Sequence, residues 1–143
     1  MSTGAETVDI IDPWLWSTLS NDATLLGMIG GQASIISTLA KAGVPAPYVV
    51  FFMSSTRDIL GVGGVRIQID ALYTVKVVGE GATWENVKPI ARRLDVLLGE
   101  KDVTTVNGSL SCRRESLIQY AEVDSATQFR HLGALWRLRA NTL

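Results

Sequence analysis

The stretch RIQIDALYTVKVV, residues 66–78, alternates between apolar and polar side chains along almost its whole length. One side of the pattern is apolar, and the other carries Gln68, Asp70, Thr74 and Lys76. Alternation with a period of two predicts a β-strand with one buried face and one solvent-facing face. At about 3.3 Å per residue the strand is about 43 Å long, whereas a compact chain of this size is about 35 Å across. One end is therefore expected to project and to need cover.

The first third of the chain predicts helix. Asp12 followed by Pro13 is a typical helix start, because a carboxylate can cap free amides and proline has no N–H to leave unbonded. Residues 21–22, Asn-Asp, predict a break and a second capped start. Further helical turns are expected up to Gly43.

A later helix is expected over residues 83–99, where apolar side chains recur at helical spacing and Gly99 marks the end. Pro89 lies inside this segment and is incompatible with a regular helix interior. Either the regular part begins near Asn86, which places Pro89 in the first turn, or the helix is kinked.

The other segments predict strands and their connections. Residues 54–64 predict a flexible, partly apolar loop. Asn107-Gly108 predicts a hairpin with a type I′ turn, because both residues accept positive φ. The four polar residues 113–116 interrupt the alternation of the next strand and predict a bulge. Besides residues 66–78, strands are expected at 44–53, 103–106, 109–123 and 129–140.

Successive strands joined by turns favour antiparallel pairing. We therefore expect an α+β fold: a mostly antiparallel sheet of about four to five strands, with two or three helices packed on one face. The 143 residues fit a single domain, residues 1–143, that buries about two thirds of the surface of its unfolded chain.

Composition excludes several classes of protein. The formal net charge is -1, so the chain lacks the basic surplus of a nucleic-acid-binding domain. The N-terminal residues are acidic and no apolar run is long enough to cross a bilayer, so neither a secretory leader nor a membrane span is expected. A single cysteine, Cys112, excludes an internal disulfide and suits the reducing cytoplasm.

The sequence offers few residues that could bind a cofactor or metal or act in catalysis. The glycine clusters lack the residues of a phosphate loop, and one histidine with one cysteine is too few for a metal site, so no cofactor and no metal are expected. Cys112 with His131 could form a thiolate–imidazole pair, with Arg114 lowering the thiol pKa, but nothing in the sequence brings His131 close. The pattern favours a half-buried cysteine and a surface histidine, and no catalytic residue is assigned.

Two features point instead to protein interfaces. Nine of the thirteen basic residues are arginine, which suits bidentate ion pairs between subunits as well as solvated surface. Trp14 and Trp16 lie two positions apart in one expected helix, so they point to different sides and cannot both enter the same core. One of them is expected at an interface or on the surface.

Taken together, the order of the segments resembles the tail terminator, or tail completion, family of long-tailed bacteriophages. The resemblance covers nearly the whole chain and consists of hydrophobic and turn patterns, not catalytic motifs. Its matching pieces are DPWLWSTLSNDATLLGMIG (12–30), APYVVFFMSSTRD (46–58), RIQIDALYTVKVVGEG (66–81), ENVKPIARRLDVLLGE (85–100), VNGSL (106–110) and HLGALWRLRA (131–140).

The resemblance implies a structural virion protein, not an enzyme. Family members form a ring, commonly a hexamer, that caps the finished tail tube, ends its polymerisation and joins it to the head. The implied partners are other copies of the chain, the tail tube protein and a head–tail connector or neck protein, with DNA passing through the lumen without specific binding. The implied location is the virion, at the tail end or neck, after assembly in the host cytoplasm.

A neighbouring subunit would then cover the overlong strands, by extending the sheet or by laying an arm on its surface. Two residues at the junction of helix and strand, Glu100 and Asp102, are expected to face the lumen. The residues expected at the interface are Trp16, Arg57, Asp58, Ile59, Leu60, Val62, Arg113 and Arg114.

Three alternatives stay open from the sequence. The chain could be a different neck component, such as a head-closure or connector protein of similar size and symmetry. It could be a small α+β enzyme that uses Cys112 or a carboxylate cluster. It could also be a plain ligand-binding domain, which would be monomeric.

Overall fold

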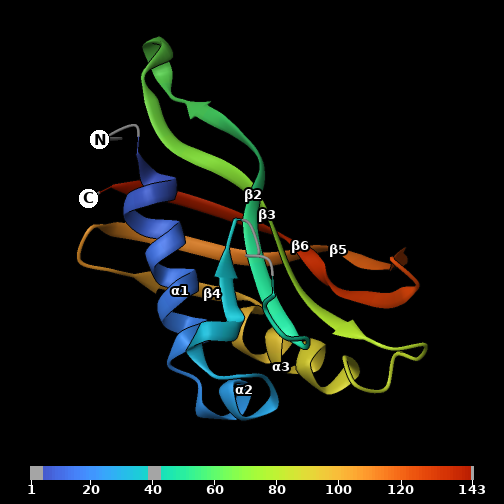
Figure 1. The fold of residues 1–143 in the computed structure, drawn as a ribbon. Coiled ribbons are helices and arrows are strands. Elements are labelled where there is room, and N and C mark those ends of the chain that lie inside the picture. Colours follow the sequence, from blue (N-terminus) through green and yellow to red (C-terminus); the bar gives the residue numbers. More distant parts are fainter. Residues whose placement is uncertain (1–4, 39–42, 143) are drawn as a thin grey trace.

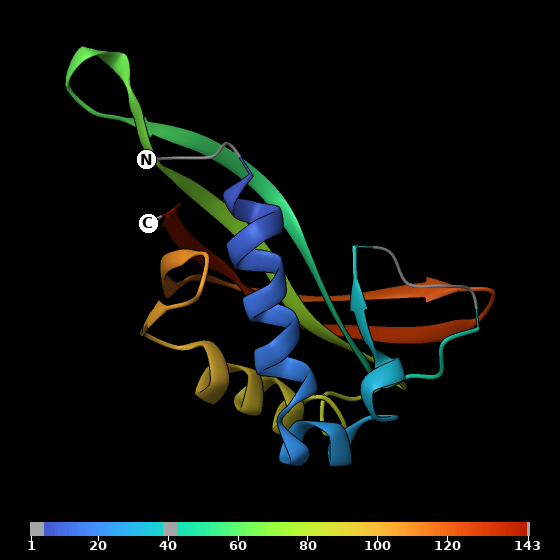
Figure 2. The ribbon, with the colours of Figure 1, turned by 90° about the vertical axis from the view of Figure 1, so that its left-hand side faces the viewer.

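The computed structural model describes residues 5–38 and 43–142. It consists of one six-stranded sheet in the order β1-β2-β3-β6-β5-β4 with its helices on one face (Figures 1 and 2). The helices are α1 (Asp12–Ser20), α2 (Ala23–Met28) and α3 (Lys88–Leu98), and a π-helical turn, Thr7–Ile11, leads into α1. The strands are β1 (Ile35–Ser37), β2 (Tyr48–Leu60), β3 (Arg66–Glu80), β4 (Lys101–Thr104), β5 (Gly108–Asp124) and β6 (Thr127–Thr142).

The expected α+β class, with a mostly antiparallel sheet and helices on one face, is confirmed, but the sheet has six strands instead of four to five. The additional strand is β1, which pairs parallel to β2 with Ile35 opposite Val49. Helical turns were expected from residue 32 to Gly43; a 3-10 turn does form over Gln32–Ser34, but Ile35–Ser37 are extended, and residues 39–42 of that prediction lie outside the described residues. Two consecutive isoleucines favour the extended chain over helix because branching at Cβ restricts χ1.

The first helix begins before the expected position. Asp12 does not cap it, since the π-helical turn already precedes Asp12 and the cap position is Ile11. The break at residues 21–22 is confirmed, because Asp22 caps α2 by accepting a hydrogen bond from the Leu25 amide at 2.9 Å. Of the two possibilities for residues 83–99, a late helix start and a kink, the late start is correct. The helix α3 begins at Lys88, so Pro89 lies in its first turn.

The hairpin between β4 and β5 is confirmed, but its turn chemistry is not. The turn closes between Thr105 and Gly108, whose backbones are joined by a 2.7 Å hydrogen bond, and neither Asn107 nor Gly108 has positive φ. Gly108 is required for another reason, since a Cβ there would overlap the backbone of Asn141 on β6.

A turn with the features of type I′ joins β5 to β6 instead. Ser125 and Ala126 have φ of 51° and 69° between the paired residues Asp124 and Thr127. The predicted bulge in β5 is confirmed by a shift of register between Arg114 and Ser116.

Two expectations about the long strands are wrong. Residues 54–60 are not a loop, because β2 continues to Leu60 in antiparallel pairing with β3. The polar face of β3 was expected to face solvent, but it is largely buried: Asp70, Thr74 and Lys76 are 2%, 5% and 9% exposed. The sheet curls, so the side that lacks helices is covered by long side chains of neighbouring strands.

The core lies between the helices and the apolar face of the sheet. Its largest fully buried side chains include Tyr73 on β3, Trp136 on β6 and Leu15 on α1. Tyr73 lies opposite Trp136 in the β3–β6 pairing. The apolar alternation of residues 66–78 therefore supplies the centre of the core, as expected from its period.

Candidate assembly interface

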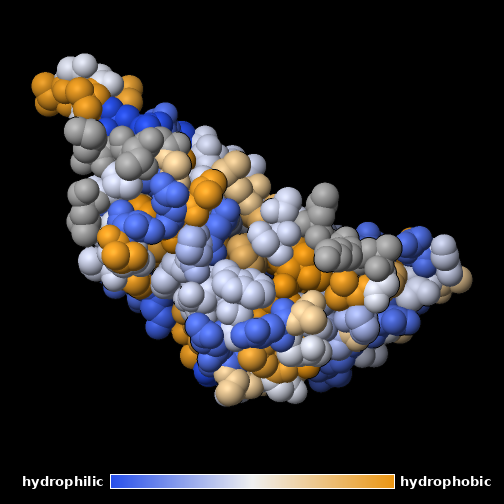
Figure 3. Space-filling model, turned by 60° about the vertical axis from the view of Figure 1, so that its left-hand side comes forward, coloured by the Kyte–Doolittle hydropathy of each residue, from blue (hydrophilic) through white to orange (hydrophobic). Residues whose placement is uncertain are grey.

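The end of the β2–β3 hairpin projects from the body as an arm, which we define as residues 58–68 (Figures 1 and 2). Pairing of β3 with β6 stops at Ile69, so beyond that point β2 and β3 pair only with each other among the described residues. Apolar side chains crowd the tip: Leu60, Val62 and Val65 are 60%, 102% and 61% exposed. Figure 3 shows the tip as a hydrophobic patch at the upper left.

The base of the arm is anchored by a buried carboxylate. Asp70 accepts hydrogen bonds from Arg137 at 2.6 Å and from Arg57 at 3.2 Å, and its other neighbour is Arg139 at 3.5 Å. Burial alone would raise the pKa of Asp70, but the hydrogen bonds and charges of the arginines, Arg137 foremost, hold it below its ordinary value. The arm therefore leaves the body in a fixed direction.

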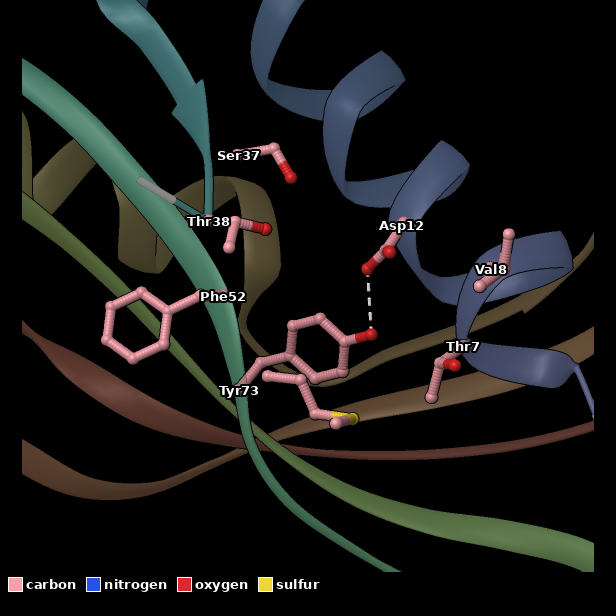
Figure 4. A pocket seen from close by; sticks show the side chains of 8 residues that line it. Thr7, Val8, Asp12, Ser37, Thr38, Phe52 and Tyr73 are labelled. Atoms are coloured by element: carbon pink, nitrogen blue, oxygen red, sulfur yellow. Dashed lines mark hydrogen bonds between the residues drawn. The ribbon is translucent and has the colours of Figure 1, made fainter. Parts of the chain in front are cut away.

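A groove opens between the N-terminal helix and the sheet, and we call it the α1–β2 groove. It has a volume of about 570 Å³ and a mostly apolar surface. Its lining residues are Thr7, Val8, Asp12, Ser37, Thr38, Phe52, Met53 and Tyr73. Figure 4 shows the Tyr73 ring pointing across the groove toward Asp12.

The polar end of the groove is built by one hydrogen bond. The Tyr73 hydroxyl donates a hydrogen bond to the Asp12 carboxylate, with the two oxygens 2.7 Å apart. Burial raises the pKa of the Tyr73 hydroxyl, and the bond to Asp12 raises it further, so the phenol remains a donor. Asp12 thus acts as an acceptor within the fold instead of as the helix cap that the sequence suggested.

The outer edge of β2 begins at this groove. β1 pairs with β2 only from Val49 to Phe51, and Thr38 adds one more backbone hydrogen bond, to the Phe51 carbonyl at 2.8 Å. From Met53 to Leu60 no strand within residues 5–38 and 43–142 pairs with this edge. An exposed edge presents unpaired N–H and C=O groups to which another chain can add.

The arm contains four of the predicted interface residues. Leu60 and Val62 are exposed at the tip, while Ile59 is half-buried. Asp58 pairs with Arg66 across the arm at 3.5 Å. Arg57 lies just below, with its guanidinium on Asp70. These residues are brought together, but whether they contact another subunit remains a prediction.

The other predicted interface residues lie apart from the arm. Trp16 is 42% exposed on α1, whereas Trp14 packs against the core, so the two tryptophans do point to different sides. Arg113 binds Asp102 across the β4–β5 pair at 3.0 Å, and Arg114 binds Asp95 on α3 at 3.1 Å. Both guanidinium groups are therefore already paired within the chain.

The two residues expected to face a lumen are exposed at the start of β4. Glu100 follows α3 with a positive φ of 50°, and Asp102 carries the ion pair with Arg113. Of these two residues, Asp102 is in an ion pair, whereas the Glu100 carboxylate is in none with another described residue.

The thiolate–imidazole pair does not form. Cys112 lies on β5 opposite Leu138 of β6, with its side chain buried toward the helices, and burial raises the thiol pKa to about 12. His131 lies seven residues before Leu138 on β6, so it points to the opposite face. It stacks on Tyr120 and binds Glu122 at 2.6 Å, and burial lowers its pKa despite that carboxylate.

The groove and part of the arm tip were not predicted from the sequence. Val65 and Ile67 are exposed beside Leu60, although Ile67 was assigned to the buried face of its strand. Val8 is 66% exposed at the groove, and Met53 is 49% exposed. Single exposed apolar residues give no signal in a sequence, and Val8 and Met53, which meet in this groove, lie 45 positions apart in the chain.

Across the described part of the chain, no three histidine, cysteine or acidic side chains converge as a metal site would require. None of the described helices is long and apolar enough to span a bilayer.

No protein-family model matches the chain, and no curated protein matches it. Among solved structures, a chain of the "Virion of native gene transfer agent (GTA) particle" is similar in fold. The TM-score is 0.69 at 18% sequence identity, and the match covers 89% of this chain and 91% of that chain. The likeness therefore extends over most of both chains and, at this identity, shows the fold alone.

Proposed function

We propose that this chain is a structural virion protein that assembles into a ring, hexameric in the finished particle, on the end of a tail tube. The ring ends polymerisation of the tube and offers the surface to which the head is joined. The chain has no catalytic role in this proposal. The supporting comparison is a fold shared over nearly its full length with a chain of a virion particle.

The observation that carries the proposal is the arm. Its apolar tip extends beyond the body, where nothing among the described residues covers it (Figure 3). Full burial of a leucine or valine side chain stabilises an assembly by about 1.5–3 kcal/mol relative to leaving it exposed. A stiff hairpin that holds several such side chains in water is therefore best explained as a contact made on assembly.

The positions of the two extensions support a ring. The arm and the far end of the β5–β6 hairpin project from different sides of the body (Figures 1 and 2). Contact between two different surfaces of identical chains is heterologous, and heterologous contacts close into rings when the rotation permits. The arm of each copy would reach the next copy around the ring.

The lumen of such a ring must let DNA slide. The formal net charge of -1 suits a subunit that does not hold phosphate. Glu100, exposed and not ion-paired with another described residue, is the better candidate for a lumen-facing repulsive charge, because Arg113 neutralises Asp102. The proposed partners are the tail tube protein on one face and a neck protein on the other.

Native mass spectrometry of the purified chain is the direct test of the ring. The expected result is one closed oligomer of six copies, seen as a ring with an open centre by electron microscopy. A strictly monomeric chain at all accessible concentrations contradicts the proposal.

The position in the particle is tested separately, by immunogold labelling of the chain in the virus that encodes it. A terminator is expected on the tube end of tails made without heads. Label on heads made without tails would instead identify a head-closure or connector protein.

A further inference from the structure

We propose that the arm of one copy docks in the α1–β2 groove of the next copy, with Leu60, Val62 and Val65 seated against Val8 and Met53. This inference rests on the proposed ring and identifies both sides of its subunit contact. The occupant of the groove is thus a second copy of this chain.

The groove and the arm tip match in size and in chemistry. A volume of about 570 Å³ lies within the range of clefts that enclose a small-molecule ligand, so the groove has room for several side chains. Its lining is mostly apolar, as is the tip of the arm. Exposed Val8 and Met53 on the groove need cover for the same reason as Leu60 and Val62 on the arm.

The charges around the two surfaces are complementary. At the groove, Asp12 accepts a hydrogen bond from the Tyr73 hydroxyl, and Asp9 is exposed one helical turn earlier. Neither carboxylate has an ion-pair partner within the described ranges.

The arm and its base carry a surplus of positive charge. Four guanidinium groups form ion pairs there with only three carboxylates. The arginines are Arg57, Arg66, Arg137 and Arg139, and the acidic residues are Asp58, Asp70 and Glu115. Arg57 keeps 71% of its side chain exposed while touching Asp70. Opposite charge on the two surfaces favours this pairing over contact between two arms, which would bring like charges together.

Backbone edges can add direction to the contact. The edge of β2 from Met53 to Leu60 begins at the groove and is unpaired in the described chain. On the arm, residues 66–68 of β3 have likewise no partner on their outer edge. An incoming arm can therefore join the sheet by strand addition while its side chains fill the groove.

The arm cannot occupy its own groove. Met53 lies at the groove and Leu60 near the tip of the same extended strand, about 23 Å apart at 3.3 Å per residue. Antiparallel pairing with β3 keeps this strand extended. Any arm that fills the groove must come from another copy.

Cysteine cross-linking tests the contact in the full chain. Cys112 is fully buried, so it does not compete for an oxidant. The double variant Val8→Cys/Val62→Cys is expected to give a ladder of disulfide-linked species that ends at the ring size found by native mass spectrometry. Each single variant, Val8→Cys or Val62→Cys, is expected to stay uncross-linked, and a mixture of the two single variants should give only dimers.

The matched control pair is Val8→Cys/Val96→Cys. Val96 is 60% exposed on α3 and belongs neither to the arm nor to the lining of the groove, so no ladder is expected. Strong dimer formation by Val62→Cys alone would show that arms meet each other and would overturn the inference.

A substitution gives a second readout. Val62→Asp is expected to weaken assembly at least tenfold, since a carboxylate on the tip would enter an apolar groove next to Asp12. Val96→Asp, on the exposed face of α3, is expected to leave assembly unchanged. Circular dichroism should show both variants folded, because neither side chain contributes to the core.

The outcomes separate the two proposals. Rings that form without cross-linking of the double variant, and that tolerate Val62→Asp, overturn the docking inference and leave the ring intact. A monomeric wild-type chain overturns both.

Discussion

Asp70 is the residue at which sequence pattern and folded environment differ most. Its place in the alternation of residues 66–78 puts it on the solvent side, yet it is only 2% exposed. Three arginines from β2 and β6 cover it, and their charges make burial of the carboxylate tolerable. Those arginines lie 13, 67 and 69 positions away in the chain, so no local sequence pattern predicts that they contact Asp70.

This environment predicts how stability depends on pH. Because the folded pKa of Asp70 is depressed, its contribution is present above the unfolded pKa of about 3.9 and is lost as pH falls through the folded value. Asp70→Asn is expected to lower the free energy of unfolding by about 2 kcal/mol at pH 7 and to flatten its decline in acid. Urea unfolding at pH 7 and pH 3 measures both effects. An equal acid dependence in wild type and variant would contradict the assignment.

The turn between β5 and β6 offers a second local test. Ser125 and Ala126 adopt positive φ, which costs a residue other than glycine about 1–2 kcal/mol. The double substitution Ser125→Asn/Ala126→Gly is therefore expected to raise the free energy of unfolding by about 1 kcal/mol. Ala121→Gly, the same change inside an extended strand, is the control and should lower it by about 0.5–1 kcal/mol. Thermal unfolding that ranks the two changes in the opposite order would refute the turn assignment.

The central strand pair, β3 with β6, depends on close backbone approach at one glycine. Gly133 lies opposite Lys76, and a Cβ there would overlap the Val75 carbonyl oxygen and the Lys76 backbone. The pattern of β6 gives no sign of this, because glycine in a strand usually only weakens it. The pairing of two specific strands creates the requirement.

Gly133→Ala is therefore expected to destabilise the protein by about 3 kcal/mol, as overpacking of a tightly built sheet does. The control is Gly27→Ala in α2, where a Cβ meets nothing within 4 Å. That change should raise stability by up to about 1 kcal/mol, because alanine favours helix. Urea denaturation measures both variants, and similar unfolding midpoints would contradict the packing described for β6.

For the molecule as a whole, the arm separates folding from assembly. None of residues 58–68 belongs to the buried core, so the body is complete without them. Their apolar tip matters only when a second surface is present to cover it. The residues that make the fold and those proposed to build the ring thus lie in different parts of the same hairpin.

Replacement of residues 59–68 by Asn-Gly tests this separation, because Asp58 and Ile69 are already paired and a two-residue turn can join them. The shortened chain is expected to keep its circular dichroism spectrum and to remain monomeric by native mass spectrometry. The matched control is the triple substitution Leu60→Ser/Val62→Ser/Val65→Ser, which keeps the arm and should also abolish the ring. A ring formed by the shortened chain would rule out the arm as the subunit contact.

Much of the fold could be predicted from local patterns. The alternation of residues 66–78 located β3, Pro89 fixed the start of α3 within one turn, and the polar run at 113–116 located the bulge in β5. Each of these signals acts within a few residues, where spacing and backbone restrictions decide the outcome. For the candidate interface, the same approach predicted Leu60 and Val62, and their contact with another subunit stays a prediction. It placed Leu60 in a loop, although β2 extends to this residue, and it placed Val62 correctly outside the strands.

The α+β class, the buried apolar face of the long strands and their excess length all follow from the period and extent of alternation in the sequence. The pairing of β1 with β2, the burial of Asp70 among arginines and the α1–β2 groove arise only in the folded chain. These features join residues far apart in the chain, and their free energy depends on which surfaces meet once the sheet has curled.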